Sequence, residues 1–223
     1  MRFLLNEPSP EPDQETETSM TPDRSSTVFI VDDDVSVRES LEALVQMVGW
    51  GTQAFASARD FLTAAPARGP SCLVLDISLP DLNGLDLQDQ IAADRADMPI
   101  IFITGYGDVP MSVRAMKAGA VEFLTKPLSE EALLVAISGA IERSRQMLGE
   151  IAELRDLRHC YGTLSRRERE VMALIVAGLL NKQVGGELGI SEITVKAHRG
   201  RVMEKMKARS FAQLVMMSAR LAP

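Results

Sequence analysis

Short apolar runs alternate with amphipathic stretches over residues 27–141 of this chain. Apolar positions spaced three or four apart favour helices, and compact runs of β-branched residues favour buried strands. Five repeats of strand then helix predict a doubly wound α/β domain with a five-stranded parallel sheet and helices on both faces. The predicted strands are Thr27–Val31, Thr52–Phe55, Cys72–Leu75, Ile100–Thr104 and Val121–Thr125, and the predicted helices are Val35–Val48, Ala58–Ala65, Leu85–Ala93, Pro110–Ala118 and one from Glu130 onward.

From Leu164 the pattern is entirely helical. Ser165 and Glu168 have the spacing of a capping box at a helix start. Four helices are predicted: one from Ser165 to Gly178, one from Asn181 to about Leu188, one over Glu192–Lys207 after the Ser191 cap, and one from Ser210 to about Arg220. A tight turn between the second and third predicts a helix-turn-helix.

Two segments flank these predicted domains. Residues 1–26 lack periodic apolar positions and are predicted to form a disordered acidic tail, within which Met20 is a second candidate start beside Met1. Residues 142–160 continue the last helix of the first domain as a helical linker. Its apolar positions, including Leu148, Ile151 and Leu154, suit either a dimer contact or a solvated connecting helix.

Polar side chains follow the predicted strands at their carboxyl ends. Asp32 and Asp33 follow the first strand, Asp76 ends the third, Thr104 ends the fourth, and Lys126 follows the fifth. The ligand crevice of a parallel sheet lies at this edge, so these groups are expected to meet there. Taken singly, each has a local explanation, because Asp32–Asp34 could cap a helix and Lys126-Pro127 could form a surface turn.

Together they provide the chemistry for accepting a phosphoryl group. Asp76 is the expected nucleophile, since a carboxylate forms an acyl phosphate readily once nearby cations compensate its negative charge. Crowded carboxylates repel one another, and oxygen ligands select Mg²⁺, which would also screen the phosphoryl oxygens. Lys126 would bind the phosphate from the opposite side, and Thr104 would donate a hydroxyl. A cis peptide bond before Pro127 would aim the lysine.

Charge divides unevenly along the chain. The whole carries −7, yet residues 27–142 hold seven Lys/Arg against seventeen Asp/Glu, and residues 143–223 hold fifteen against eight. An acidic first part and a basic last part indicate two roles, the second beside nucleic acid. Two distant cysteines and the lack of a secretory signal or a membrane span indicate a cytoplasmic protein with reduced thiols.

Residues 27–141 resemble the receiver domain of a two-component response regulator, and the stretch from Thr104 to Pro110 resembles the FixJ subgroup. The resemblance lies in Asp32-Asp33, Asp76 with Pro80 and Gly84, Thr104-Gly105 and Lys126-Pro127. It implies that Asp33 binds Mg²⁺ directly, that Asp32 binds it through water, and that Ser78 offers a backbone carbonyl. Phe123 matches the aromatic residue that turns inward when the hydroxyl residue, here Thr104, moves.

Residues 164–220, within a predicted DNA-binding domain of residues 161–223, resemble the LuxR-type helix-turn-helix domain of the NarL/FixJ family, through Leu164–Val171, Asn181-Lys182 and Ile190–Arg199. On the third helix, Ile193, Val195, Val202, Met203 and Met206 are expected to face the core, and Lys196, Arg199, Arg201 and Lys205 to face outward. His198 suits either helix packing or a DNA contact. The expected DNA-binding residues are Lys182, Thr194, Lys196, His198, Arg199 and Arg201.

The chain is therefore expected to be a transcriptional response regulator rather than an enzyme. A histidine kinase would phosphorylate Asp76, and the phosphorylated chain would dimerise, release its output domain, bind a double-stranded DNA operator and engage RNA polymerase. A phosphatase of the haloacid dehalogenase type needs a second Asp at position 78, where this chain has Ser78. A constitutive DNA binder and a phosphate trap without DNA binding are two rival hypotheses. The kinase, the operator and the sign of regulation do not follow from the residues.

Overall fold

The computed structural model describes residues 25–92, 94–105 and 107–221. The tail predicted over residues 1–26 therefore lies almost wholly outside the described residues, as does Tyr106. Within them the predicted architecture is confirmed, with element ends that differ from prediction by one or two residues in most cases.

Five parallel strands form the sheet, in the order β2-β1-β3-β4-β5. Every side chain of β3 and β4 is buried, because both strands are paired on both edges and covered on both faces. Asp76 is the last residue of β3 and pairs in register with Ile103, one residue before Thr104. The strands are β1 (Thr27–Val31), β2 (Gly51–Phe55), β3 (Ser71–Asp76), β4 (Ile100–Thr104) and β5 (Glu122–Thr125).

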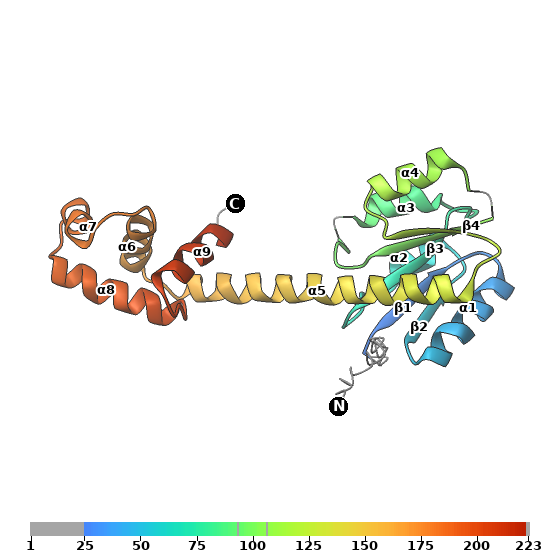
Figure 1. The fold of residues 1–223 in the computed structure, drawn as a ribbon, viewed down its shortest axis with the longest axis horizontal. Coiled ribbons are helices and arrows are strands. Elements are labelled where there is room, and N and C mark those ends of the chain that lie inside the picture. Colours follow the sequence, from blue (N-terminus) through green and yellow to red (C-terminus); the bar gives the residue numbers. More distant parts are fainter. Residues whose placement is uncertain (1–24, 93, 106, 222–223) are drawn as a thin grey trace, which may run out of the picture.

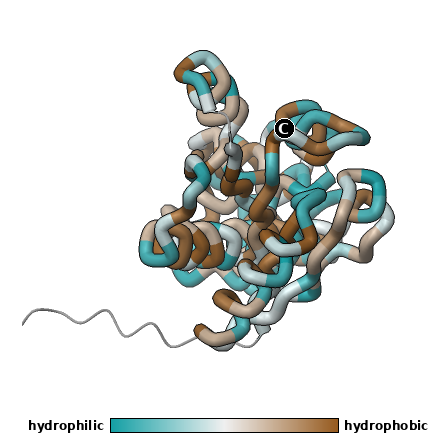
Figure 2. The backbone as a smooth tube through the Cα atoms, turned by 90° about the vertical axis from the view of Figure 1, so that its right-hand side faces the viewer, coloured by the Kyte–Doolittle hydropathy of each residue, from teal (hydrophilic) through white to brown (hydrophobic). Residues whose placement is uncertain are grey.

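Helices cover both faces of this sheet (Figure 1). On one face, α2 (Ala58–Thr63), α3 (Gly84–Ile91) and α4 (Val109–Lys117) enclose a core that includes Phe29, Leu75 and Phe102. On the other face, α1 (Val35–Val48) and the first part of α5 enclose a second core. Hydrophobic and hydrophilic segments alternate along the backbone (Figure 2).

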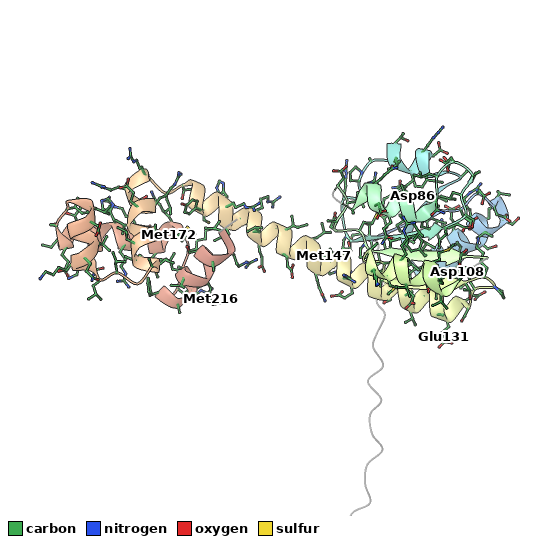
Figure 3. The ribbon with its side chains drawn as sticks, turned by 90° about the horizontal axis from the view of Figure 1, so that it is seen from above. Asp86, Asp108, Glu131, Met147, Met172 and Met216 are labelled. Atoms are coloured by element: carbon green, nitrogen blue, oxygen red, sulfur yellow. The ribbon has the colours of Figure 1, made fainter. Side chains whose placement is uncertain are left out.

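Helix α5 (Glu130–Gly162) is a single helix of 33 residues that joins the two parts of the molecule. Ile137 and Ile141 are buried against the sheet, whereas Leu157 is buried in the C-terminal core. Ser144 marks the point where α5 leaves the sheet, since its hydroxyl donates to Asp97 O at 2.7 Å and accepts from Ser71 N at 3.0 Å. Met147 lies beyond it, on the stretch between the two parts (Figure 3).

The C-terminal domain contains α6 (Arg166–Val176), α7 (Asn181–Leu188), α8 (Glu192–Lys205) and α9 (Phe211–Leu221). The predicted capping box is present, with Ser165 and Glu168 bonded to one another's backbone amides. Ser191 caps α8 and the Ser210 hydroxyl accepts from Gln213 N, also as predicted. The core of this domain includes Val171, Val195, Val202 and Leu214.

Among the described residues no helix combines the length and apolarity needed to cross a membrane. Cys72 and Cys160 are both free thiols. The peptide bond between Lys126 and Pro127 is cis, as the sequence suggested.

Candidate phosphoacceptor site and nucleic-acid interface

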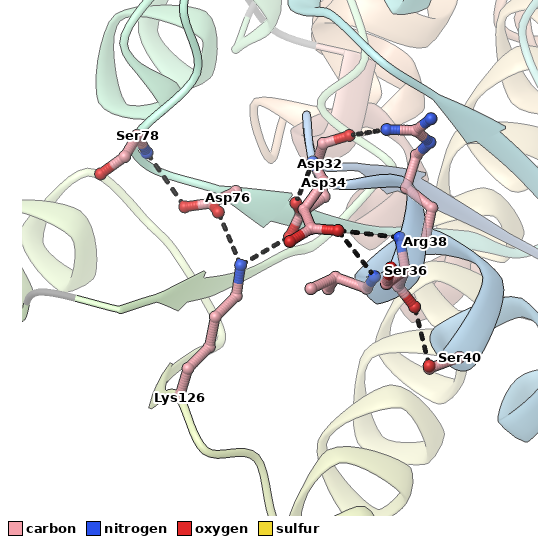
Figure 4. Close-up of polar contacts among 9 residues, drawn as sticks. Asp32, Asp34, Ser36, Arg38, Ser40, Asp76, Ser78 and Lys126 are labelled. Carbon is pink, nitrogen blue, oxygen red and sulfur yellow. Dashed lines mark hydrogen bonds and ion pairs between the residues drawn. The ribbon is translucent and has the colours of Figure 1, made fainter.

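The sheet brings Asp76, Asp32 and Lys126 into direct contact (Figure 4). Lys126 Nζ lies 2.7 Å from Asp76 Oδ2 and 2.7 Å from Asp32 Oδ2. The other Asp76 oxygen, Oδ1, accepts a hydrogen bond from Ser78 N at 3.0 Å. Residues 50 or more positions apart thus meet at the carboxyl edge of the sheet, where the sequence predicted a site.

Burial controls the electrostatics of this cluster. Asp32 has no exposed surface, and loss of water raises the pKa of its carboxyl group more than the Lys126 hydrogen bond lowers it. Burial by itself would lower the pKa of Lys126, but hydrogen bonds to Asp32 and Asp76 outweigh this and raise it. Lys126 is therefore held as a cation directly beside Asp76.

Three carboxylates at this edge fit a divalent cation. Asp32, Asp33 and Asp76 each offer an oxygen, and these oxygens all lie within 4.8 Å of one another. Asp33 is exposed, so it can reach an ion that enters from solvent. Asp34, by contrast, caps α1 by accepting a hydrogen bond from Ser36 N at 2.8 Å, so neither Asp32 nor Asp33 has to serve as the helix cap. An all-oxygen set of this kind suits Mg²⁺.

Thr104 and Phe123 lie beside this cluster, next to Gly107. Thr104 is fully buried, and its backbone oxygen accepts from Lys126 N at 2.8 Å. A Cβ atom added to Gly107 would lie 2.9 Å from Phe123 Cε1 and 3.2 Å from Thr104 Cγ2. The Phe123 ring and the Thr104 methyl group therefore converge on one small residue, and only glycine fits there without displacing them.

Helix α8 presents an exposed face that differs in part from the predicted one. Lys196 and Arg201 are exposed as expected, and Lys196 Nζ pairs with Glu192 Oε1 at 3.1 Å. Thr194 is half-buried and bonds Ser191 at the helix start. Ile193 was expected to face the core, and this is wrong, because its side chain is 80% exposed. Residues 195, 202 and 206 supply the buried stripe, and Ile193 lies on the opposite side of the helix.

Two cations of α8 contact neighbouring helices. Lys205 Nζ lies 2.7 Å from Glu168 Oε2, so Lys205 forms an ion pair with α6 while its side chain stays 37% exposed. Arg199 is half-buried, with its guanidinium 5.0 Å from the centre of the Phe211 ring and 3.5 Å from Asn181 Oδ1. Each of these two cations bonds or stacks on a neighbouring helix, which periodicity within α8 could not reveal.

His198 is half-buried, and its Nδ1 atom is enclosed without a hydrogen-bond partner among the described residues. Lys182 is exposed in the first turn of α7, where the amide groups of a helix start also favour an anion.

Glu168→Gln is expected to lower the free energy of unfolding of the C-terminal helices by about 1.5 kcal/mol at pH 7, because it removes a charged hydrogen-bond partner of the partly exposed Lys205. The hydrogen bond from Lys205 is the main reason that the pKa of Glu168 falls from 4.5 to about 2. A depressed pKa stabilises above pH 4.5, and this contribution disappears as the pH falls toward 2.

The check is hydrogen exchange of α6 and α8 across a urea series at pH 7 and again near pH 2. Glu170→Gln is the matched control, since Glu170 pairs with exposed Arg166 and Arg167 on the surface. An equal loss for Glu168→Gln at both pH values would show that charge is not the source of the stabilisation.

Comparison with known proteins agrees with both parts of the molecule. Residues 28–138 match the response regulator receiver domain, and residues 162–218 match the luxR family of bacterial regulatory proteins. The chain is 51% identical over 194 residues to nodulation protein W of Bradyrhizobium diazoefficiens, covering 87% of this chain and 86% of that protein. It is 43% identical to the transcriptional regulatory protein FixJ of Rhizobium meliloti, covering 86% and 94%. The solved structure of response regulator StyR superposes with a TM-score of 0.77 at 44% identity, covering 87% and 98%.

A receiver fold with an aspartate cluster, followed by a helix-turn-helix, defines the class of transcriptional regulators rather than a class of enzymes. The chain belongs to the response regulators that join a receiver domain to a luxR-type DNA-binding domain, the NarL/FixJ family.

Proposed function

We propose that Asp76 accepts a phosphoryl group from a histidine kinase and that the phosphorylated chain dimerises and binds an operator. The observation that carries this is the Lys126 ammonium at 2.7 Å from both Asp76 and Asp32. The phosphorus–nitrogen bond of the donor phosphohistidine would break as an Asp76 oxygen bonds to phosphorus. Residues 27–141 would act as the receiver, 142–160 as the linker and 161–223 as the output domain, in the cytoplasm where the operator lies.

Each group of the cluster has a role in this proposal. Lys126 would leave the Asp76 carboxylate for a phosphoryl oxygen and balance the added charge. Asp32, Asp33, Asp76 and the Ser78 carbonyl would hold Mg²⁺, which neutralises the carboxylates and screens the phosphoryl oxygens when bound. Thr104 would follow the phosphate with its hydroxyl, and Phe123 would turn further into the space that Thr104 leaves.

The surface of α4 is the proposed dimer face. Val109, Val113 and Met116 are spaced along one side of α4 and are 75%, 43% and 45% exposed. This helix lies next to β5, which carries Phe123, so movement of Phe123 would reach it directly. RNA polymerase is a further proposed partner, by way of the DNA-bound dimer.

Phosphorylation is expected to strengthen dimerisation by about 1–3 kcal/mol, which is roughly 5- to 150-fold in the dimer dissociation constant. Val113→Glu should prevent this shift and leave phosphorylation intact, because a charge would be buried in the dimer contact. Sedimentation of wild type and Val113→Glu, with and without acetyl phosphate, measures the shift from monomer to dimer. Met47→Glu is the control, as Met47 is 76% exposed on α1, away from α4. Equal masses with and without phosphate would contradict this face and this mechanism.

The DNA-binding assignment is tested by two lysines with different expected roles. Lys196→Ala should cost about 1–3 kcal/mol and relax one operator position, because Lys196 is exposed on α8, where it can reach a base edge. Lys182→Ala should weaken binding to all DNA sequences alike. It should also reduce the slope of log affinity against log salt concentration by about one, as expected for a phosphate contact. Titrations at several salt concentrations separate the two.

Arg59→Ala is the matched control, since it removes the same charge from α2 in the sheet domain. If Lys196→Ala bound the operator as wild type does at every salt concentration, α8 would not be the reading helix. Arg199→Ala is expected to weaken binding through lost packing on Phe211 rather than through a lost base contact.

A further inference from the structure

The exposed face of α8 carries an unexpected apolar side chain at its centre. Ile193, Ala197 and Gly200 follow one another along this face, between Lys196 on one side and Arg201 on the other. A Cβ atom added to Gly200 would meet nothing within 4 Å, which places that position in open space. Within α8, which is described in full, Ile193 is the large hydrophobic side chain that remains exposed.

Folding of the domain gives no reason for isoleucine at this position. At 80% exposure Ile193 adds little to the core, which is built from Val195, Val202 and other buried residues. The helix start has its own apolar pair in half-buried Ile190 and buried Val195, at the positions of a hydrophobic staple. Isoleucine is also a poorer helix former than alanine.

Charge and shape indicate what covers this face. The segment 143–223 has fifteen Lys/Arg against eight Asp/Glu, and Lys196 and Arg201 flank Ile193 on α8. The small residues Ala197 and Gly200 would let the helix axis approach the floor of a DNA major groove closely. The N-terminal part of such a helix is the part that reaches base edges, and Ile193 lies in the first turn.

We propose that Ile193 reads thymine through the C5 methyl group, and so sets sequence specificity at one position of each operator half-site. Isoleucine has no donor or acceptor, and the thymine methyl is the apolar group that base edges present in the major groove. Beside cytosine or guanine the same side chain would remove water from polar groups without replacing their hydrogen bonds. This inference rests on the proposed role of α8 as the reading helix.

Thymine-to-uracil substitution tests it, since uracil lacks only that methyl group. The probe is a duplex selected from a random library by the full chain treated with acetyl phosphate and Mg²⁺, with each thymine replaced in turn. At one position per half-site uracil should weaken wild-type binding about fourfold, as for one methyl group returned to water. The same replacement should not affect Ile193→Ala, whose helix propensity is higher than that of wild type.

Ile193→Val should keep the sensitivity to uracil, and Met47→Ala, at an equally exposed position on α1, should behave as wild type. If every thymine-to-uracil change weakens wild type and Ile193→Ala equally, the inference is overturned. If in that case Lys196→Ala still loses affinity, α8 remains the reading helix and only the role of Ile193 is wrong. If Lys196→Ala also binds as wild type, both proposals fail.

Discussion

Asp76→Asn is expected to abolish labelling of the chain by acetyl phosphate and to leave the fold intact. An amide cannot act as the nucleophile, but its oxygen can still accept the hydrogen bond from Ser78 N that Asp76 accepts at 3.0 Å. One carboxylate fewer also relieves the repulsion among the crowded acids. The measurement is incorporation of phosphate by mass spectrometry of the intact chain, with circular dichroism as the check on folding.

Asp81→Asn is the matched control. Asp81 lies in the same loop after β3, but its two carboxylate oxygens accept from the amides of Ala58 and Arg59 at 3.3 and 3.0 Å, so asparagine would keep one of these hydrogen bonds and would not alter the Asp76 cluster. The Asp81→Asn variant should be labelled by acetyl phosphate to the same extent as wild type. Removing Mg²⁺ with EDTA should suppress labelling of both wild type and Asp81→Asn, because the carboxylate cluster needs charge compensation. Stoichiometric labelling of Asp76→Asn would refute the assignment of the acceptor.

Gly185→Ala and Gly186→Ala are expected to have opposite effects on stability, although they are neighbours in α7. A Cβ atom on Gly185 would lie 2.7 Å from the Ile190 backbone oxygen, and the Gly185 oxygen already accepts from Ile190 N at 3.0 Å. The turn between α7 and α8 would have to shift, at a cost of about 1–3 kcal/mol, and the two helices would lose their mutual placement. The affinity of Gly185→Ala for the operator should therefore also fall.

Gly186 has nothing within 4 Å of an added Cβ atom. Gly186→Ala should therefore raise the free energy of unfolding by about 0.5–1 kcal/mol through helix propensity, and operator affinity should be unchanged. Urea unfolding and DNA titration of the two variants check both expectations. Equal effects of the two substitutions would show that close contact between α7 and the turn does not position α8. Helix propensity by itself would treat the two glycines alike, because it does not depend on the contacts that each position makes.

Much of the fold could be predicted from local patterns. Compact apolar runs are typical of strands buried on both faces, and apolar positions with a period near 3.6 are typical of helices with one buried face. These patterns located the five strands and all nine helices of the described residues. The serines at 165, 191 and 210 cap their helices by accepting hydrogen bonds from amides three positions later, so both partners can be read from the linear sequence. The cluster at Asp76 followed from one rule, that the carboxyl ends of parallel strands meet.

Only the tertiary structure decided contacts between elements. Helix periodicity already places positions 193 and 195 on opposite sides of α8, so only one of them can face inward, and the structure shows that it is Val195. Lys205 pairs with Glu168 and Arg199 packs on Phe211 because α6 and the start of α9 lie beside α8 at those points, and such contacts do not appear in the order of residues. The sequence by itself determined the elements and the chemistry at the strand ends, since both depend on near neighbours, whereas the partners of each charge depended on packing between segments distant along the chain.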